Sequence, residues 1–598
     1  MRPGGIGSGP VGKVLVANRG EIAVRILRAC AELGLRGVAV YSDADRDAPH
    51  VLAADEAWHI GPATPARSYL DGAAILRVAA RAGVDAVHPG YGFLAENAGF
   101  AQAVLDAGLR WVGPGPEAIA VMGDKMSARK MAERAGAPLV PGTLEPVPGA
   151  EGVRAFGERH GYPVALKAAF GGGGRGMKVV AGPEEAAAAL ESAERESLAA
   201  FGRSEVYLER YLVAPRHVEA QVLADEHGEV AFVGDRDCSL QRRHQKLVEE
   251  APAPGLSETV RKALAGAAVA IADTAGYANA GTVEFLFDPA TEQVYFLEMN
   301  TRLQVEHPVT ELVAGIDLVQ AQLRIAAGEH LADVLGELRP RGHALECRIN
   351  AEDPGAGFLP APGPITAWRE PSGPGIRVDA GVRTGFTVPQ AYDSLLAKLI
   401  VWGEDRERAR RRMLRALGEF EIAGVPTTIP FHKLAMADPA FAAGHVSTTL
   451  VEQEMDLSSL APASVPAADA RPAAKPPPRR MVIELEDKRF EVAVLPQEPV
   501  PVPKRPRTPR SPKALERARA ESGGPGREVV TTPMQGTIVK VLVAEGDTVA
   551  PGQTLVVLEA MKMENHVTVH QAGVVSKLAV AEGESVATGA MIATIEAS

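Results

Sequence analysis

The stretch Glu559-Ala560-Met561-Lys562-Met563-Glu564-Asn565 places one lysine between two methionines. The apolar run Gln553–Glu559 precedes it, and the run Val567–His570 follows it. Two such runs around a short polar turn predict a β-hairpin with Lys562 at its tip. An ordinary exposed lysine is the simplest interpretation of such a turn. The two methionines favour a recognition role, because they would expose apolar surface beside a solvated turn for little folding gain.

The same region contains an internal repeat. The segment Gly536–Ala560 recurs as Gly573–Ala597, about 37 residues later. Both copies contain Ala-Glu-Gly, then Asp-Thr-Val-Ala or Glu-Ser-Val-Ala, and both finish with an apolar run and Glu-Ala. A repeat of this length is one supersecondary unit used twice. We therefore expect residues 530–597 to form an all-β domain, a flattened sandwich or barrel of short strands with pseudo-twofold symmetry.

The composition of the whole chain limits the classes of protein to which it can belong. Its 598 residues are 46% hydrophobic and 23% charged, as in ordinary globular proteins, and the length predicts several domains. The net charge of −12 argues against nucleic-acid binding, and no apolar run is long enough to cross a membrane. Three widely spaced cysteines and the absence of an evident targeting signal predict a cytoplasmic protein.

The N-terminal region, residues 11–122, alternates apolar runs with helical patterns. Strands are expected at Lys13–Asn18 and Gly37–Tyr41, with a helix at Glu21–Leu33 between them. Further helices are expected near Tyr69–Arg81 and Ala98–Ala107. Such alternation predicts an α/β domain with a parallel sheet and helices on both of its faces.

A glycine-rich loop follows an apolar strand in the next region, residues 123–330. The strand Val164–Lys167 leads to Gly171-Gly172-Gly173-Gly174-Arg175-Gly176, and the apolar pattern resumes directly afterwards. Glycines allow the backbone to approach a ligand closely, so that its N–H groups can face phosphate oxygens. A flexible linker is the alternative, but linkers are usually longer and lack strands on both sides.

Polar residues alternate with other residues in Glu298-Met-Asn300-Thr-Arg302-Leu-Gln304-Val-Glu306. If this segment is extended, its polar side chains share one face. The strand Thr282–Phe287 lies upstream, and hairpin pairing would bring Glu284 close to Glu298 and Asn300. Two carboxylates and an amide oxygen would suit Mg²⁺ bound together with phosphates. An amphipathic surface strand would show the same alternation.

A third charged cluster, residues 235–246, contains Asp235, Arg236, Gln241, His244 and Lys246. Taken alone, it is equally well explained as a solvated loop. Its Cys238 is expected to be a small packed residue.

Residues 453–529 form an expected linker, rich in proline, alanine, arginine and lysine. One hairpin is expected within it, at residues 480–495, and a single hairpin cannot bury a core. The part after the hairpin has about 30 residues and could reach about 90 Å if extended, which suits a mobile carrier domain. A passive spacer is the alternative.

These motifs resemble two families. Met-Lys-Met with Pro533-Met534-Gln535-Gly536 resembles the biotin carboxyl carrier domain, in which the central lysine is biotinylated. Lipoyl domains share that fold but commonly place other residues around the lysine. Residues 11–450 resemble the ATP-grasp biotin carboxylases through His88–Asn97, the glycine loop, Arg236–Pro254, Glu298–Pro308 and Glu346–Pro354. The resemblance implies an α/β N-terminal domain, an ATP-grasp domain (residues 123–330), an α+β closing domain (residues 331–452) and the linker and carrier domain.

The resemblance also implies a role for each matching residue. The residues expected to bind ATP are Lys125, Lys167, Gly172, Gly173, Gly174, Glu209, Arg210, Leu212, His217, Gln241 and His244. Glu284, Glu298 and Asn300 are expected to bind Mg²⁺ or Mn²⁺. Bicarbonate is expected to contact Lys246, Arg302, Gln304 and Val305. The expected catalytic residues are Glu306 as the base, Arg348 facing the biotin ureido oxygen, Lys246 and Arg302, with biotin carried on Lys562.

The implied activity is the ATP-dependent carboxylation of carrier-bound biotin by bicarbonate. No segment after residue 450 is long enough for a carboxyltransferase, so a separate acyl-CoA-binding β subunit is the expected partner in a hetero-oligomer. The arrangement resembles the α chain of actinobacterial acyl-CoA carboxylases of fatty-acid metabolism, with acetyl-CoA, propionyl-CoA or a longer acyl-CoA as the acceptor. Biotin-protein ligase is the second expected partner.

Three alternatives stay open at this point. The chain could be the α chain of a pyruvate, urea or 3-methylcrotonyl-CoA carboxylase. It could be a carrier and scaffold with an inactive ATP site, against which Lys246, Glu306 and Arg348 argue. It could also be an ATP-dependent ligase with a lipoyl arm, which the mass of the intact protein would distinguish.

Overall fold

The computed structural model describes residues 11–143, 145–168, 177–201, 204–463, 479–485, 488–494, 527–532, 536–560, 563–586 and 589–596. The chain divides into two compact units, Met1–Pro462 and Ala463–Ser598. Among the described residues, no helix has both the length and the apolar character needed to cross a lipid bilayer.

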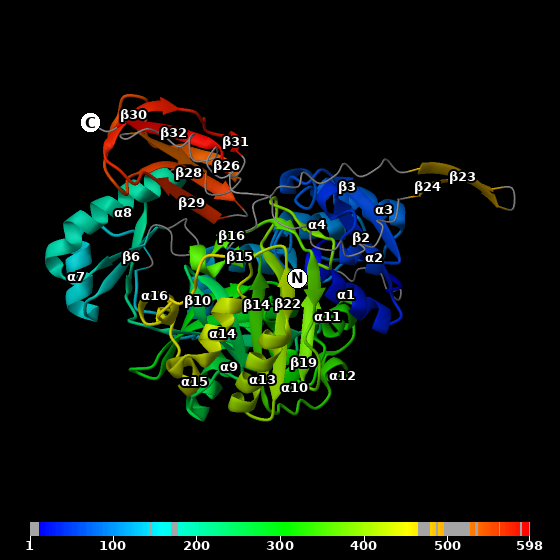
Figure 1. Ribbon diagram of the computed structural model, residues 1–598. Coiled ribbons are helices and arrows are strands. Elements are labelled where there is room, and N and C mark those ends of the chain that lie inside the picture. Colours follow the sequence, from blue (N-terminus) through cyan, green and yellow to red (C-terminus); the bar gives the residue numbers. More distant parts are fainter. Residues whose placement is uncertain are drawn as a thin grey trace. The chain divides into compact units, whose positions relative to one another are not determined.

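The first unit begins with a five-stranded sheet in the order β3-β2-β1-β4-β5, in which every strand pair is parallel. Its strands are β1 (Lys13–Val16), β2 (Arg36–Ser42), β3 (Glu56–Gly61), β4 (Ala86–His88) and β5 (Arg110–Trp111). The helices are α1 (Gly20–Glu32), α2 (Pro49–Ala53), α3 (Gly72–Ala82), α4 (Ala98–Asp106) and α5 (Pro116–Gly123), with 3₁₀ turns at Asp43–Asp45 and Pro65–Arg67. The predicted parallel α/β domain is confirmed (Figure 1).

Local sequence explains where these helices begin and which face they bury. In α1, Ile22, Ile26 and Cys30 recur every four residues and are buried together. Helix α3 begins at Gly72, three residues later than predicted from Tyr69, because the side chain of Asp71 accepts a hydrogen bond from the Ala74 N–H and caps the helix.

A small lobe contains the strand before the glycine-rich loop. Its antiparallel sheet has the order β7-β6-β8, formed by β6 (Val164–Ala168), β7 (Met177–Val180) and β8 (Val206–Arg210). Helices α7 (Ala150–His160) and α8 (Ala186–Phe201) accompany these strands (Figure 1), with a 3₁₀ turn at Pro183–Glu185. Helix α6 (Lys125–Arg134) precedes the lobe in sequence, but its Ala128 and Ala132 pack in the core of the large sheet. Val153, Leu166 and Leu190 are among the residues of the lobe's own core. The lobe is therefore a separately packed element, and none of its three strands pairs with a strand of the large sheet.

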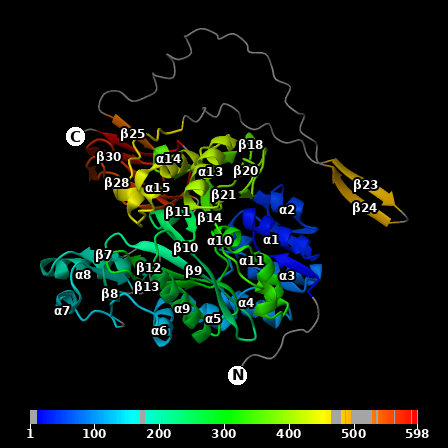
Figure 2. The same cartoon turned by 90° about the horizontal axis from the view of Figure 1, so that it is seen from below.

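An eight-stranded antiparallel sheet forms the centre of the first unit, in the order β13-β12-β9-β10-β11-β14-β21-β19. Figure 2 shows β9, β10, β12 and β13 side by side. The strands are β9 (Arg216–Ala224), β10 (Val230–Arg242), β11 (Gln245–Ala251), β12 (Asn279–Asp288), β13 (Gln293–Asn300), β14 (His343–Asn350), β19 (Ile376–Ala380) and β21 (Leu395–Gly403). Because β11 pairs with β14, the sheet is continuous across residue 330, where two domains were expected to meet.

Helices and short strands complete this unit. The helices are α9 (Glu258–Thr274), α10 (His307–Ala314), α11 (Leu318–Ala326), α12 (Leu331–Leu335), α13 (Arg406–Glu419), α14 (Ile429–Ala437), α15 (Pro439–Ala443) and α16 (Leu450–Gln453), with a 3₁₀ turn at Pro354–Ala356. The short strands are β15 (Glu352–Asp353), β16 (Leu359–Pro360), β17 (Gly363–Pro364), β18 (Ala367–Arg369), β20 (Thr387–Val388) and β22 (Glu421–Ala423). This is the mixed α+β segment that was expected after residue 330.

The second unit contains the expected linker hairpin and the repeat. The hairpin is formed by β23 (Arg479–Leu485) and β24 (Lys488–Val494). The repeat forms two four-stranded sheets, β25-β32-β30-β27 and β29-β28-β26-β31. Their strands are β25 (Arg527–Thr531), β26 (Gly536–Val541), β27 (Thr548–Val549), β28 (Thr554–Ala560), β29 (Met563–Thr568), β30 (Gly573–Leu578), β31 (Ser585–Val586) and β32 (Met591–Glu596).

The register of these strands confirms the repeat in detail. Strand β26 pairs with β28 as β30 pairs with β32, and both pairs have an irregularity one residue before a lysine, Lys540 or Lys577. The short strand of each copy pairs with the other copy, β27 with β30 and β31 with β26. The two halves are therefore interlocked, which gives the predicted pseudo-twofold all-β domain.

Candidate active site

Two facing carboxylates lie on the hairpin of β12 and β13. Glu284 is opposite Glu298, and Thr282 is opposite Asn300, as the sequence predicted. Asn300 donates a hydrogen bond to Glu284 Oε1 at 2.9 Å. Burial raises the pKa of Glu298, and the neighbouring Glu284 carboxylate raises it further. A cation between these groups would relieve their repulsion, so the donor set fits a divalent metal ion with oxygen ligands.

The segment Glu298–Glu306 is extended only at its start, so the condition under which all its polar side chains would share one strand face is not met. Strand β13 ends at Asn300, and the chain bends and turns before α10. Pro308 lies in the first turn of α10, a position that proline favours, and Glu306 is the residue that precedes the helix. The polar side chains converge through this turn and not along one strand face.

The turn still brings Arg302 and Gln304 to the carboxylate hairpin. Arg302 donates hydrogen bonds to Asn300 Oδ1 at 2.9 Å, to Gln304 Oε1 at 3.0 Å and to Glu96 Oε2 at 2.8 Å. Gln304 in turn donates to Glu284 Oε1 at 3.2 Å. The segment is thus held over the hairpin by a chain of polar contacts.

Lys246 lies at the centre of the site. Its ammonium group contacts Glu219, Glu284 Oε1 at 2.9 Å and Glu306 Oε1 at 2.7 Å. The side chain is 13% exposed. Burial alone would lower the pKa of Lys246, but the three carboxylates raise it well above its ordinary value, with Glu219 and Glu284 contributing most. Lys246 therefore carries a positive charge that an anionic substrate can share.

Glu306 is completely buried between two cations. One oxygen accepts from Lys246, and the other accepts from Arg348 Nη2 at 2.9 Å. Burial acts to raise the pKa of Glu306, but Lys246 and Arg348 outweigh it and hold the pKa well below its ordinary value. The group is an ionised carboxylate, which is the form a proton acceptor needs.

Arg348, on strand β14 of the large sheet, bridges two carboxylates. Its Nε donates to Glu249 Oε1 at 2.5 Å, and its Nη2 donates to Glu306. Burial raises the pKa of Glu249 to about 7, against the opposing effect of Arg348. The Arg348 backbone is held as well, because its carbonyl accepts from Thr428 Oγ1 at 2.8 Å and lies 2.7 Å from His432 Nε2. Hydrogen bonds therefore hold both the side chain and the backbone of Arg348 in place.

His217 lies on the other side of Glu284. Its Nε2 is 3.0 Å from Glu284 Oε2, and its backbone N–H donates to Ser239 Oγ. Burial would lower the pKa of His217, but the Glu284 carboxylate raises it above the ordinary value. Within the described residues, two clusters of acidic, histidine or cysteine side chains have ligand atoms close enough to hold a metal ion, and His217, Glu219 and Glu284 form one of them.

The remaining residues predicted to bind ATP are spread over the small lobe and the sheet edge. Lys167 of β6 forms an ion pair with Glu209 of β8, and Arg129 donates to the same carboxylate at 2.9 Å. Arg210 lies 4.0 Å from Asp288. The other four are Lys125 at the start of α6, Leu212 and Gln241, which are buried, and His244, which is exposed. Gly172, Gly173 and Gly174 lie outside the described residues.

Three residues of the site were missed from the sequence. Arg236 is fully buried and donates to Glu219 Oε2 at 2.9 Å, to Gln221 Oε1 at 2.8 Å and to two threonine hydroxyls. Glu219 thereby connects Arg236 to Lys246, and Glu249 supports Arg348. The possible interpretation of residues 235–246 as a solvated loop is wrong, because Arg236 and Cys238 lie on the buried part of β10. The alternation of polar residues in His217-Val-Glu219-Ala-Gln221 was the available signal.

The carrier hairpin also has the predicted pairing. Strands β28 and β29 are antiparallel, and their last described pair is Ala560 with Met563. Lys562, the predicted biotinylation site, lies outside the described residues.

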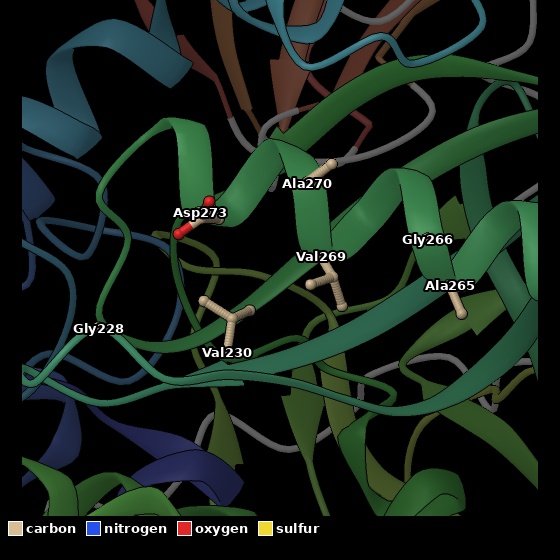
Figure 3. A pocket seen from close by; sticks show the side chains of 7 residues that line it. All are labelled: Gly228, Val230, Ala265, Gly266, Val269, Ala270 and Asp273. Carbon is tan, nitrogen blue, oxygen red and sulfur yellow. The ribbon is translucent and has the colours of Figure 1, made fainter.

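A hollow of about 480 Å³ lies elsewhere, between α9 and the start of β10. Val230 and Val269 come from these two elements, and Asp273 lies at its edge (Figure 3). None of the predicted site residues lines it, so the carboxylate and lysine cluster is the candidate active site.

Comparisons with known families cover most of the chain. The family "Biotin carboxylase, N-terminal domain" matches residues 10–119, "Carbamoyl-phosphate synthase L chain, ATP binding domain" matches 124–334, and "Biotin carboxylase C-terminal domain" matches 346–453. The family "Biotin-requiring enzyme" matches residues 528–595. The biotin-dependent acyl-coenzyme A carboxylase alpha3 subunit of Mycobacterium leprae is 51% identical over 581 residues, which are 94% of this chain and 95% of that protein.

The chain belongs to the biotin-dependent carboxylases. It is an ATP-dependent biotin carboxylase, and therefore a ligase, joined to a biotinyl carrier domain. A pyruvate carboxylase subunit from Methanothermobacter thermautotrophicus is 51% identical over 441 residues, which are 74% of this chain and 89% of that protein.

Solved structures of other biotin carboxylases have the same fold. A biotin carboxylase from Campylobacter jejuni has a TM-score of 0.70 and 44% identity, covering 74% of this chain and 98% of that one. The biotin carboxylase domain of the 2-oxoglutarate carboxylase of Hydrogenobacter thermophilus, in complex with MgADP, ADP and bicarbonate, has a TM-score of 0.70 and 45% identity. That match covers 76% of this chain and all of the other. The predicted fold class is confirmed.

Proposed function

We propose that this biotin carboxylase uses Glu306 as the base that activates bicarbonate, and that it is the α subunit of an acyl-CoA carboxylase. One observation carries the assignment of the base. Glu306 is a buried, ionised carboxylate held between Lys246 and Arg348, next to the facing pair of Glu284 and Glu298. This arrangement supplies a proton acceptor, two cations for an anionic substrate and a site for a metal ion.

Glu284, Glu298 and Asn300 would hold the metal ion, Mg²⁺ or Mn²⁺. The raised pKa of Glu298 beside Glu284 supports this, because a bound cation removes the repulsion between the two. A bound metal ion would neutralise charge on the ATP phosphates during phosphoryl transfer. The Hydrogenobacter thermophilus domain is in complex with MgADP, which supports magnesium as the metal ion that accompanies the nucleotide.

The nucleotide would lie between the small lobe and the large sheet. The residues proposed to bind it are Lys125, Lys167, Gly172, Gly173, Gly174, Glu209, Arg210, Leu212, His217, Gln241 and His244. Phosphoryl transfer depends mainly on positioning and on charge neutralisation, which the lysines and loop amides would provide. Closure of the small lobe over the nucleotide would exclude water from the site.

Bicarbonate would bind at Lys246, Arg302, Gln304 and Val305. Glu306 removes its proton, and the bicarbonate oxygen attacks the γ-phosphorus of ATP to give carboxyphosphate and ADP. Carboxyphosphate then breaks down to CO₂ and phosphate, and the phosphate accepts the proton of the biotin nitrogen. Biotin supplies the ureido nitrogen that accepts CO₂, and Arg348 is placed to stabilise negative charge on the ureido oxygen.

Lys562 would carry the biotin, which is attached by a biotin-protein ligase. A separate carboxyltransferase β subunit that binds acyl-CoA would receive the carboxyl group, in a hetero-oligomer. The Mycobacterium leprae acyl-CoA carboxylase subunit matches 581 residues, including the carrier domain, whereas the pyruvate carboxylase subunit matches 441. This difference favours acetyl-CoA, propionyl-CoA or a longer acyl-CoA over pyruvate as the final acceptor. A cytoplasmic location is proposed from the three unpaired, buried cysteines.

The test is ADP release by the purified full chain with ATP, Mg²⁺ and free biotin, with and without bicarbonate. We expect release that depends on bicarbonate and is lost in Arg348→Ala. Release that ignores both bicarbonate and this substitution would overturn the assignment of the site.

A further inference from the structure

Two backbone carbonyls of the turn before α10 are held by buried side chains. His307 Nδ1 lies 2.8 Å from the carbonyl oxygen of Gln304, and Lys398 Nζ donates to the carbonyl oxygen of Val305 at 2.9 Å. Both His307 and Lys398 are completely buried. These two buried side chains therefore fix the backbone of the turn that precedes the proposed base.

Lys398 comes from a different part of the chain, strand β21. Its ammonium group lies 3.2 Å from Glu21 Oε2, in the first turn of α1, and 4.0 Å from Asp379 Oδ2 of β19. The hydroxyl of Tyr91 donates to the other oxygen of Glu21. A buried ammonium group is costly unless it is paired, so these carboxylates explain how a lysine can be kept at this place.

Peptide geometry links the two carbonyls to the substrate side of the turn. The C=O and N–H of a trans peptide unit point in opposite directions. A Val305 carbonyl fixed on Lys398 therefore turns the Glu306 N–H the other way, and a Gln304 carbonyl fixed at His307 does the same for the Val305 N–H. Within the described part of the chain, neither of these two N–H groups donates a hydrogen bond to the protein.

We propose that Lys398 is a positioning residue that aims the amides of Val305 and Glu306 at bicarbonate. This inference rests on the proposed function, which places bicarbonate at Val305. It explains how an apolar residue contributes to an anion site, because the contribution comes from its backbone N–H. Lys398 does not touch the substrate, and its ammonium group acts through the Val305 carbonyl.

A purely structural role for Lys398 predicts a different result. Loss of a buried ion pair lowers the stability of the protein but does not change its affinity for bicarbonate relative to its affinity for ATP. Loss of a positioned amide weakens bicarbonate binding and leaves ATP binding unchanged. The two roles are therefore separated by comparing the KM for bicarbonate with the KM for ATP.

The experiment uses Lys398→Met in the full chain, with ADP release measured at varied bicarbonate and at varied ATP. We expect the KM for bicarbonate to rise about tenfold or more and the KM for ATP to change by less than about twofold. The double variant Lys398→Met with Glu21→Gln removes the charge of Lys398 and that of its nearer carboxylate, while Asp379 keeps its hydrogen bonds from Arg377. It replaces the single variant if that one does not fold.

Arg406→Met is the matched control. Arg406 forms a partly buried ion pair with Glu250 at 2.7 Å and donates hydrogen bonds to the carbonyls of Phe441 and Ala442. Like Lys398, it therefore contacts both a carboxylate and backbone oxygens. We expect it to lower the melting temperature without raising the KM for bicarbonate. If the Lys398 variants keep the wild-type KM for bicarbonate, or change it no more than Arg406→Met does, the inference is wrong. If the wild-type chain shows no bicarbonate-dependent ADP release, the proposed function itself fails.

Discussion

Replacing Glu306 by glutamine removes the proposed base with the smallest change in shape. The amide oxygen can still accept from one of the two cations, but the amide nitrogen cannot accept from the other. The lost contact is either the 2.7 Å bond from Lys246 or the 2.9 Å bond from Arg348. A hydrogen bond to a charged group contributes about 1.5–3 kcal/mol, which is the expected loss in the free energy of unfolding.

The effect on rate should be much larger than this loss of stability suggests. General base catalysis typically contributes a factor of about 10²–10⁴, which corresponds to about 3–5 kcal/mol in the activation free energy. We expect bicarbonate-dependent ADP release by Glu306→Gln to fall by this factor. The assay is ADP release with ATP, Mg²⁺ and free biotin, at bicarbonate concentrations that saturate the wild-type enzyme.

Glu311 offers a matched control five residues further along, in α10. It is also buried, and its two oxygens accept from Arg25 at 2.9 Å and from Arg377 at 2.7 Å. Glu311→Gln should therefore lose similar stability and keep most of the activity. If both variants lose activity equally, the loss follows stability and Glu306 is not the base. The same conclusion holds if Glu306→Gln keeps a rate within about threefold of the wild type, well below the contribution of a general base.

Four further outcomes are expected. Lys562→Arg should abolish the increase in intact mass that biotinylation gives, while ADP release with free biotin continues. Lys246→Met removes the strongest of the cations that lower the pKa of Glu306, so this pKa should rise. Glu306 would then be protonated at a higher pH, and the acid limb of the kcat/KM profile should shift to higher pH. Glu298→Gln should raise the Mg²⁺ concentration needed for half-maximal ADP release, because one ligand loses its charge. Arg236→Met should lower the free energy of unfolding by about 3–5 kcal/mol in a denaturant titration, since it leaves a buried carboxylate without that partner.

Local patterns were sufficient to predict several parts of this structure. The closeness of Glu284 to Glu298 follows from a short turn between two strands, because the turn pairs the strands that it joins. The exact register does not follow from the turn, since an irregularity between Glu284 and Phe285 moves Glu284 from Leu297 to Glu298. The carrier domain followed from a repeat, and the repeat survives in the register itself, with corresponding irregularities before Lys540 and Lys577. In both cases the decisive contacts lie between segments close together in sequence.

Contacts between distant segments could not be predicted in the same way. Arg236 donates to Thr310, 74 positions further along the chain, and Glu249 meets Arg348 across the pairing of β11 with β14, about a hundred positions apart in sequence. A charged residue in a sequence is most often solvated, and only the sheet order shows that Arg236 is buried. The end of the extended segment at Asn300 had a local signal that was not used, because Pro308 marks the start of a helix.

The charged groups of the site satisfy one another, and this connects the two substrates. Glu284 accepts from Lys246, Asn300 and Gln304, so the proposed metal ligand and the proposed bicarbonate ligands share one carboxylate. A metal ion bound to Glu284 would compete with the hydrogen bonds that this carboxylate accepts. Lys246 would then keep two of its three carboxylate partners, and the Gln304 amide would lose its acceptor on Glu284. Both groups would then be available to an anion. On this assignment the metal nucleotide prepares the bicarbonate site, and binding of the two substrates should be cooperative.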